Sequence, residues 1–120
     1  METSDGTSEP CVMLDASLHG LVGRHAELDA LLSDLASATR AEPGCRSYRI
    51  LRGEEPGEIV LLSVFTDQEA LRAHFATPHY RRYREQVGPL LARPSDVIVH
   101  YLSSSVRALD PNPPDPGMLG

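Results

Sequence analysis

The stretch IVLLSVFTDQEAL, residues 59–71, joins a predicted strand directly to the start of a predicted helix. Its first part, 59–65, is a continuous apolar run with β-branched and aromatic residues, which is typical of a strand. Thr66 and Glu69 then match the S/T-x-x-E pattern of a capping box, which marks the beginning of a helix. We therefore predict a strand at 59–65 and a helix over about 67–76.

Upstream of this stretch the sequence predicts two strands with a helix between them. The apolar run 11–18 and the alternating segment 45–52 are both typical of strands. An amphipathic helix over about 24–41 is indicated by four leucines spaced i, i+3, i+4 and i+7, namely Leu28, Leu31, Leu32 and Leu35. Pro43 ends this helix, because the residue before a proline is disfavoured in the helical region.

Downstream, Thr77 and Pro78 predict a helix restart, with the threonine as N-cap and the proline at the first helical position. This helix is expected to continue to about Leu91, with a weakened end at Gly88-Pro89. The segment 96–105 is predicted to be the last strand.

The predicted order β-α-β-β-α-β is that of the ferredoxin-like α+β fold, a four-stranded antiparallel sheet with helices on one face. Its usual strand order, 4-1-3-2, places a whole strand between the first and second strands. Cys11 and Cys45 would therefore be about 9 Å or more apart and would not form a disulfide. We interpret both cysteines as small hydrophobic side chains.

The third and fourth strands are apolar on both faces, although helices can cover only one face. On the third strand, Ile59, Leu61 and Phe65 oppose Val60, Leu62 and Val64; on the fourth, Val97, Val99 and Tyr101 oppose Ile98, His100 and Leu102. A two-fold homodimer that pairs the sheets would cover the second face with one self-complementary surface.

Composition excludes several classes of function. A net charge of −6 without a dense basic patch argues against nucleic-acid binding. No apolar run approaches the ~20 residues that span a bilayer, and the polar N-terminus is unlike a signal peptide, so we expect a cytoplasmic protein. The domain is predicted at 11–105, between a disordered lead, 1–10, and an extended proline-rich tail, 106–120.

The segment LRAHFATPHYRRY, residues 71–83, concentrates candidate site residues. His74 shares a helix face with Leu71, and is either a core residue or a general base with a suitable pKa. His79 and Tyr83 are four residues apart on a stripe that is either core or pocket wall. Arg81, Arg82 and Arg84 are interpreted as a solvated face, and Tyr48 as facing either the pocket or the dimer interface.

Metal and cofactor motifs are not evident in the sequence. His74 and His79 are five residues apart, a poor spacing for two ligands on one helical face, and the five histidines form no compact ligand set. There is no dinucleotide fingerprint, phosphate-binding loop or nucleophile elbow. We therefore predict that no metal is bound.

Residues 40–91 resemble the antibiotic biosynthesis monooxygenase family. The resemblance is carried by RAEPGCRSY (40–48), IVLLSVFTDQEAL (59–71) and AHFATPHYRRY (73–83) followed by VGPLL (87–91). It implies a ferredoxin-like fold and a dimer with facing sheets. It also implies oxygenation of an anthrone or quinol in secondary metabolism, with molecular oxygen as co-substrate and without metal or flavin.

In such proteins the pocket lies between the helices and the sheet. On that basis, His74 and Tyr83 are the candidate catalytic residues. The candidate substrate-binding residues are Leu61, Ser63, Phe65, Phe75, Tyr48 and His79. Phe65 stands where many active relatives have tryptophan, and the chain has no tryptophan, which disfavours the haem-degrading branch.

Two other functions fit the same scaffold. One is a lyase, cyclase or isomerase that uses His74 without oxygen. The other is a non-catalytic dimer that binds an aromatic metabolite or supports a partner enzyme. One fold hosts many functions, so the fold cannot separate these hypotheses.

Overall fold

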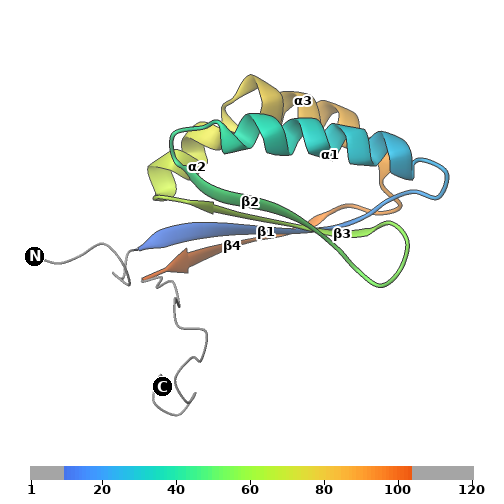
Figure 1. Ribbon diagram of the computed structural model, residues 1–120, viewed down its shortest axis with the longest axis horizontal. Coiled ribbons are helices and arrows are strands. Elements are labelled where there is room, and N and C mark those ends of the chain that lie inside the picture. Colours follow the sequence, from blue (N-terminus) through green and yellow to red (C-terminus); the bar gives the residue numbers. More distant parts are fainter. Residues whose placement is uncertain (1–9, 104–120) are drawn as a thin grey trace, which may run out of the picture.

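In a computed structural model, residues 10–103 form a four-stranded antiparallel sheet with three α-helices on one face (Figure 1). The elements, in chain order, are β1 (Cys11–His19), α1 (His25–Arg40), β2 (Cys45–Arg52), β3 (Glu58–Phe65), α2 (Gln68–Phe75), α3 (Pro78–Val87) and β4 (Asp96–Leu102). The predicted ferredoxin-like order is confirmed. Of the predicted flanking segments, the tail 106–120 and residues 1–9 of the lead lie outside the described residues.

The sheet has the order β2-β3-β1-β4, which is the predicted order read from the opposite edge. β1 and β3 are therefore the central strands, and β2 and β4 are the edges. Cys11 on β1 and Cys45 on β2 are both free, and β3 separates their strands.

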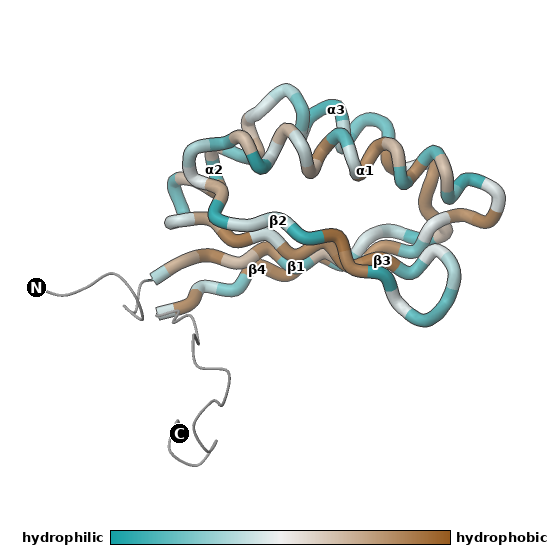
Figure 2. The backbone as a smooth tube through the Cα atoms, in the orientation of Figure 1, coloured by the Kyte–Doolittle hydropathy of each residue, from teal (hydrophilic) through white to brown (hydrophobic). Residues whose placement is uncertain are grey.

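The two faces of the sheet differ in burial. On β3, the buried side chains face the helices and are Ile59, Leu61, Ser63 and Phe65. The half-buried side chains of the same strand face away from the helices and are Val60, Leu62 and Val64. We call this second face the open face. Figure 2 shows that hydrophobic residues follow the central strands, whereas the β2–β3 turn and much of α3 are hydrophilic.

Local capping explains where α2 and α3 begin. The N-cap of α2 is Asp67, whose carboxylate accepts a hydrogen bond from the Ala70 amide at 2.8 Å. The predicted cap, Thr66, lies one residue too early. The predicted start of α3 is confirmed, because Thr77 caps the helix and Pro78 occupies its first turn.

The ends of the last two elements differ from the predictions. The α-helix ends at Val87, and a short 3₁₀ turn, Gly88–Leu90, replaces the expected continuation to Leu91. Pro89 lacks the amide hydrogen that an α-helical bond would require. β4 ends at Leu102. Within residues 10–103, no helix is long and apolar enough to cross a membrane.

Candidate functional site

A cavity of about 310 Å³ lies between the helices and the sheet. Every strand and helix of the domain contributes to it, so the cavity depends on the complete fold. Its walls are lined by Leu14, Ala16, Leu35, Tyr48, Leu61, Ser63, His74, Tyr80, Tyr83, Arg84, Val87, Ser95 and Val97. Among these lining residues there is no carboxylate, so the charged group at the cavity is the Arg84 guanidinium.

The structure brings most of the predicted site residues together. Both candidate catalytic residues line the cavity, as do three of the candidate binding residues, Leu61, Ser63 and Tyr48. Tyr48, for which the sequence left two positions open, lies on the helix side of the sheet and is buried.

Three predicted binding residues do not line the cavity. Phe65 is 0% exposed and packs behind His74, with the ring centroids 4.9 Å apart. Phe75 is 39% exposed, because it lies one residue, or about 100° of helix rotation, away from His74. His79 lies in the first turn of α3 and contacts a carboxylate rather than the cavity.

His74 is held between aromatic rings at one end of the cavity. Its side chain is 1% exposed, and its ring lies 4.9 Å from Phe65 and 5.0 Å from Tyr80, measured between centroids. This burial lowers the pKa of His74 below its usual value, and a hydrogen bond to Glu42 partly offsets the effect. The imidazole is thus held in its neutral form, the form that accepts a proton.

The partner of His74 comes from the turn between α1 and β2. His74 Nδ1 lies 2.9 Å from Glu42 Oε2, so the ring donates this hydrogen bond to the carboxylate. Gly44 permits the close approach of this turn to α2, because a Cβ at this position would lie 2.3 Å from the Ala70 Cβ. The turn Glu42-Pro43-Gly44 therefore places Glu42 beside α2, which begins 26 residues later in the sequence.

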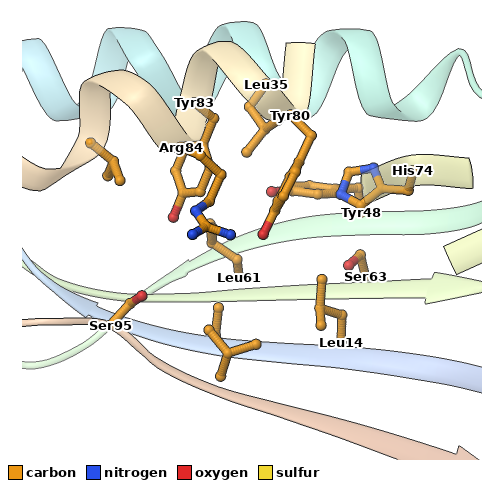
Figure 3. A pocket seen from close by; sticks show the side chains of 13 residues that line it. Leu14, Leu35, Tyr48, Leu61, Ser63, His74, Tyr80, Tyr83, Arg84 and Ser95 are labelled. Atoms are coloured by element: carbon orange, nitrogen blue, oxygen red, sulfur yellow. The ribbon is translucent and has the colours of Figure 1, made fainter. Parts of the chain in front are cut away.

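The other ring nitrogen of His74, Nε2, is buried and has no hydrogen-bond partner among the described residues. Figure 3 shows the ring directed from α2 towards the tyrosine side chains of the cavity. A buried polar atom without a partner is costly, and such atoms in native proteins have a specific reason. Because Nδ1 is the donor to Glu42, Nε2 of the neutral ring carries a lone pair that no described residue uses.

Besides the hydroxyls of Ser63 and Ser95, three tyrosines and an arginine supply polar groups to the cavity. In Figure 3 the polar ends of Tyr48, Tyr80, Tyr83 and Arg84 point into the same space. Burial raises the pKa of Tyr83 to about 12 and raises the pKa of Tyr48 further. Both hydroxyls therefore keep their protons and act as hydrogen-bond donors at neutral pH.

Sequence reasoning missed Glu42 and did not foresee that Arg84 also lines the cavity. The prediction of a solvated face holds for Arg81 and Arg82, which are exposed and do not line the cavity. Arg84 is exposed as well, but its guanidinium lies 6.0 Å from the centre of the Tyr80 ring and reaches the cavity. The sequence did hold a signal for this position: Arg84 is four residues after Tyr80, and residues i and i+4 share a helix face.

Contrary to the prediction, His74 and His79 do come together, because the helix is interrupted at Thr77 and the chain changes direction between α2 and α3. With Glu42 they form a group whose ligand-type atoms lie within 4.8 Å of one another. A tetrahedral ion with bonds of about 2.0–2.1 Å would hold its ligands about 3.3 Å apart. The contacts to Glu42 Oε2, at 2.9 and 2.5 Å, are shorter, so these atoms are spaced as hydrogen bonds.

The fold and the cavity define a class: ferredoxin-like α+β proteins with a cavity between the helices and the sheet. Residues 12–86 match the model of the family described as antibiotic biosynthesis monooxygenase. The chain belongs to this family, and a general monooxygenase-like function is supported.

Solved structures and curated relatives agree with this assignment. Rv0793 from Mycobacterium tuberculosis is 36% identical to the chain, with a TM-score of 0.74, covering 83% of this chain and 99% of that one. By sequence alone it is 47% identical over 72 residues, 60% of this chain and 71% of the relative. The structure of SO0527 from Shewanella oneidensis is 27% identical, with a TM-score of 0.71 and coverage of 81% and 96%. The protein sll1783 from Synechocystis is 27% identical over 105 residues, 87% of this chain and 71% of the relative.

Proposed function

We propose that the protein is a cytoplasmic, cofactor-independent monooxygenase of secondary metabolism that acts on an aromatic, polyketide-like anthrone or quinol. One observation carries this proposal: a buried histidine, His74, has a ring nitrogen beside the tyrosine-lined cavity that no described residue hydrogen-bonds. A neutral imidazole in such a place can accept a proton from an acidic benzylic or phenolic position.

The chemistry begins with proton transfer. His74 Nε2 takes the proton from a benzylic C–H, and the electron pair of the broken bond stays on the substrate as an enolate. The carbanion carbon of that enolate adds to molecular oxygen, which is thereby reduced to a bound peroxide. Return of the proton to the peroxide and loss of water convert the CH₂ group into a carbonyl, so one oxygen atom enters the product and the other leaves as water.

The other cavity groups suit this sequence. Tyr48 and Tyr83 offer O–H donors, and Arg84 offers a positive charge, for the oxygen on which negative charge develops. Such stabilisation is strongest where water is excluded. The apolar walls, including Leu61 and Leu35, suit an aromatic ring system.

The test is oxygen uptake by the purified protein with a dithranol-like anthrone and with hydroquinones, after dialysis against a chelator. We expect about one oxygen molecule to be consumed per substrate molecule, and no visible absorbance from flavin or haem. The control substrate is 10,10-dimethylanthrone, which has no benzylic proton to remove and should not react. Activity that disappears on dialysis and returns with a metal contradicts the cofactor-free mechanism. If no anthrone or quinol reacts, the lyase and binding-protein hypotheses become the better ones.

We also propose that the protein is a homodimer joined through the open face of the sheet. That face carries the half-buried apolar residues Val60, Leu62 and Val64, and the edge strand adds Ile98, which is 47% exposed. A surface of this kind is self-complementary under a two-fold axis. A second copy of the chain therefore suits it better than an unrelated partner.

Sedimentation at micromolar concentration should give about twice the chain mass of 13.1 kDa. Leu62→Glu should give a folded monomer, because it places a charge on the open face, where a second copy of the chain would bury it without a partner. Ala26→Glu, on the exposed side of α1, serves as the control and should remain dimeric. A well-folded wild-type monomer under these conditions contradicts the proposed interface.

A further inference from the structure

We propose that Glu42 is the positioning residue for the base His74, and that His79 holds Glu42 in place. The base function of His74 belongs to the proposed function, and this inference rests on it only for its effect on catalysis. The arrangement of the three side chains stands by itself and can be measured without a substrate.

The three residues come from separate segments and meet at one oxygen atom. Glu42 lies in the turn after α1, His74 near the end of α2, and His79 in the first turn of α3. His74 Nδ1 and His79 Nε2 lie 2.9 and 2.5 Å from Glu42 Oε2. Side-chain exposure rises from 1% for His74 to 12% for Glu42 and 18% for His79. The group therefore runs from the cavity wall towards the surface.

The position of Glu42 selects the tautomer of His74. A carboxylate accepts hydrogen bonds, so a neutral His74 must carry its proton on Nδ1. Nε2 then has a lone pair and no proton, which is the state that a base needs. When Nε2 takes the substrate proton, the ring becomes an imidazolium, and the adjacent carboxylate balances its charge. Glu42 does not line the cavity, so it can act on the substrate only through His74.

His79 has a different task from His74. It donates a second hydrogen bond to the same oxygen, and neither His79 nor Glu42 lines the cavity. A carboxylate that is clamped from two sides keeps one orientation. His79 also lowers the pKa of His74, whereas Glu42 raises it, so the two neighbours have opposite effects on the base.

The other titratable groups near these three residues are few. Tyr80 on α3 packs on the His74 ring. On β2, burial raises the pKa of the Cys45 thiol, and the Glu42 carboxylate raises it further. From β3, the side chain that packs on His74 is Phe65, and phenylalanine has no titratable group. Burial is the largest influence on the pKa of His74, and Glu42 and His79 are the charged or titratable groups that follow it.

Nitrogen-15 NMR of the histidine rings, recorded without substrate, tests the arrangement. Wild-type His74 should be the Nδ1–H tautomer. Glu42→Gln removes the negative charge, so the pKa of His74 should fall further. Glu42→Asp should recover part of the difference. His79→Gln should change the pKa of His74 in the opposite direction, upwards. The control is Glu69→Gln, because Glu69 lies on the same helix as His74 but pairs with Arg72 at the surface. It should change neither the tautomer nor the pKa of His74.

Kinetics provide the second readout, with the sign fixed by the same shifts. A base works when deprotonated, so activity rises with pH through the pKa of His74. The rise should move to lower pH in Glu42→Gln and to higher pH in His79→Gln. Misorientation of the base should also lower kcat in Glu42→Gln by about 10²-fold, with partial recovery in Glu42→Asp.

Three results would overturn the inference. The first is an Nε2–H tautomer of His74 in the wild type. The second is a His74 pKa that Glu42→Gln leaves unchanged or that His79→Gln fails to raise. The third is a stoichiometric metal in the purified protein that is lost in Glu42→Gln, which would make the group a metal site. The NMR results remain valid if no anthrone or quinol consumes oxygen, so failure of the proposed reaction is distinguishable from failure of this arrangement.

Discussion

His74→Ala should lower kcat on a dithranol-like anthrone by about 10²–10⁴-fold, which is the usual loss when one positioned acid or base is removed. Tyr48, Tyr83 and Arg84 cannot replace it as a base. The pKa values of Tyr48 and Tyr83 are raised, so their hydroxyls donate rather than accept protons, and Arg84 is always protonated. Substrate binding should be less affected, since most of the cavity wall is unchanged. Oxygen uptake at saturating substrate measures the effect.

The comparison variant is His79→Ala, which should cost much less, because His79 does not line the cavity and reaches His74 only through Glu42. His74→Gln retains a polar side chain of similar size and serves if the alanine variant is poorly folded. Circular dichroism and sedimentation establish that fold and assembly are intact. A folded His74→Ala enzyme as fast as the wild type would show that His74 only packs, and the mechanism would lose its base.

Phe65→Ala should reduce the free energy of unfolding by about 3–5 kcal/mol, the usual loss for a fully buried phenylalanine. Phe65 is 0% exposed and belongs to a small core cluster with Val12, Leu14 and Leu71. It also supports one side of the His74 ring. The domain is expected to have about 5–15 kcal/mol of stability in total, so this loss is a large part of it. Urea denaturation measures the change. If the alanine variant does not fold, Phe65→Leu replaces it, with a smaller expected loss.

The chain offers a matched control, because its second phenylalanine, Phe75, is 39% exposed. Phe75→Ala leaves little cavity and should cost about 1 kcal/mol or less. Similar losses at the two positions would mean that the buried cluster around Phe65 contributes no more to stability than a surface ring contact.

The sequence by itself determined the order of the helices and strands, and which residues of a strand share a face of the sheet. Periodicities of two and 3.6 residues are local properties of the chain, and they placed β3 and α1 within one residue of their observed ends. Helix starts were less certain, because Thr66 and Asp67 are both good cap residues. Only the backbone geometry selects the one whose oxygen meets a free amide, here Asp67.

Part of the cavity was also predicted. Leu61 and Ser63 were candidates because of the family resemblance, and Tyr48 was left between the pocket and the dimer interface. His74 was a candidate because it shares a helix face with Leu71, and all four residues line the cavity. Arg84 was assigned to solvent because a charged residue is usually exposed. A long side chain can lie along an apolar wall with its charged end elsewhere, and sequence does not show where that end goes.

What only the tertiary structure decided is the group formed by Glu42, His74 and His79. On one continuous helix, two residues five apart would point about 140° away from each other. The break at Thr77-Pro78 changes the direction of the chain, and the turn at Gly44 brings in a carboxylate from 32 residues upstream of His74. A pattern of spacing describes neighbours along one element. The contacts of this group join three elements, and their distances depend on how those elements pack.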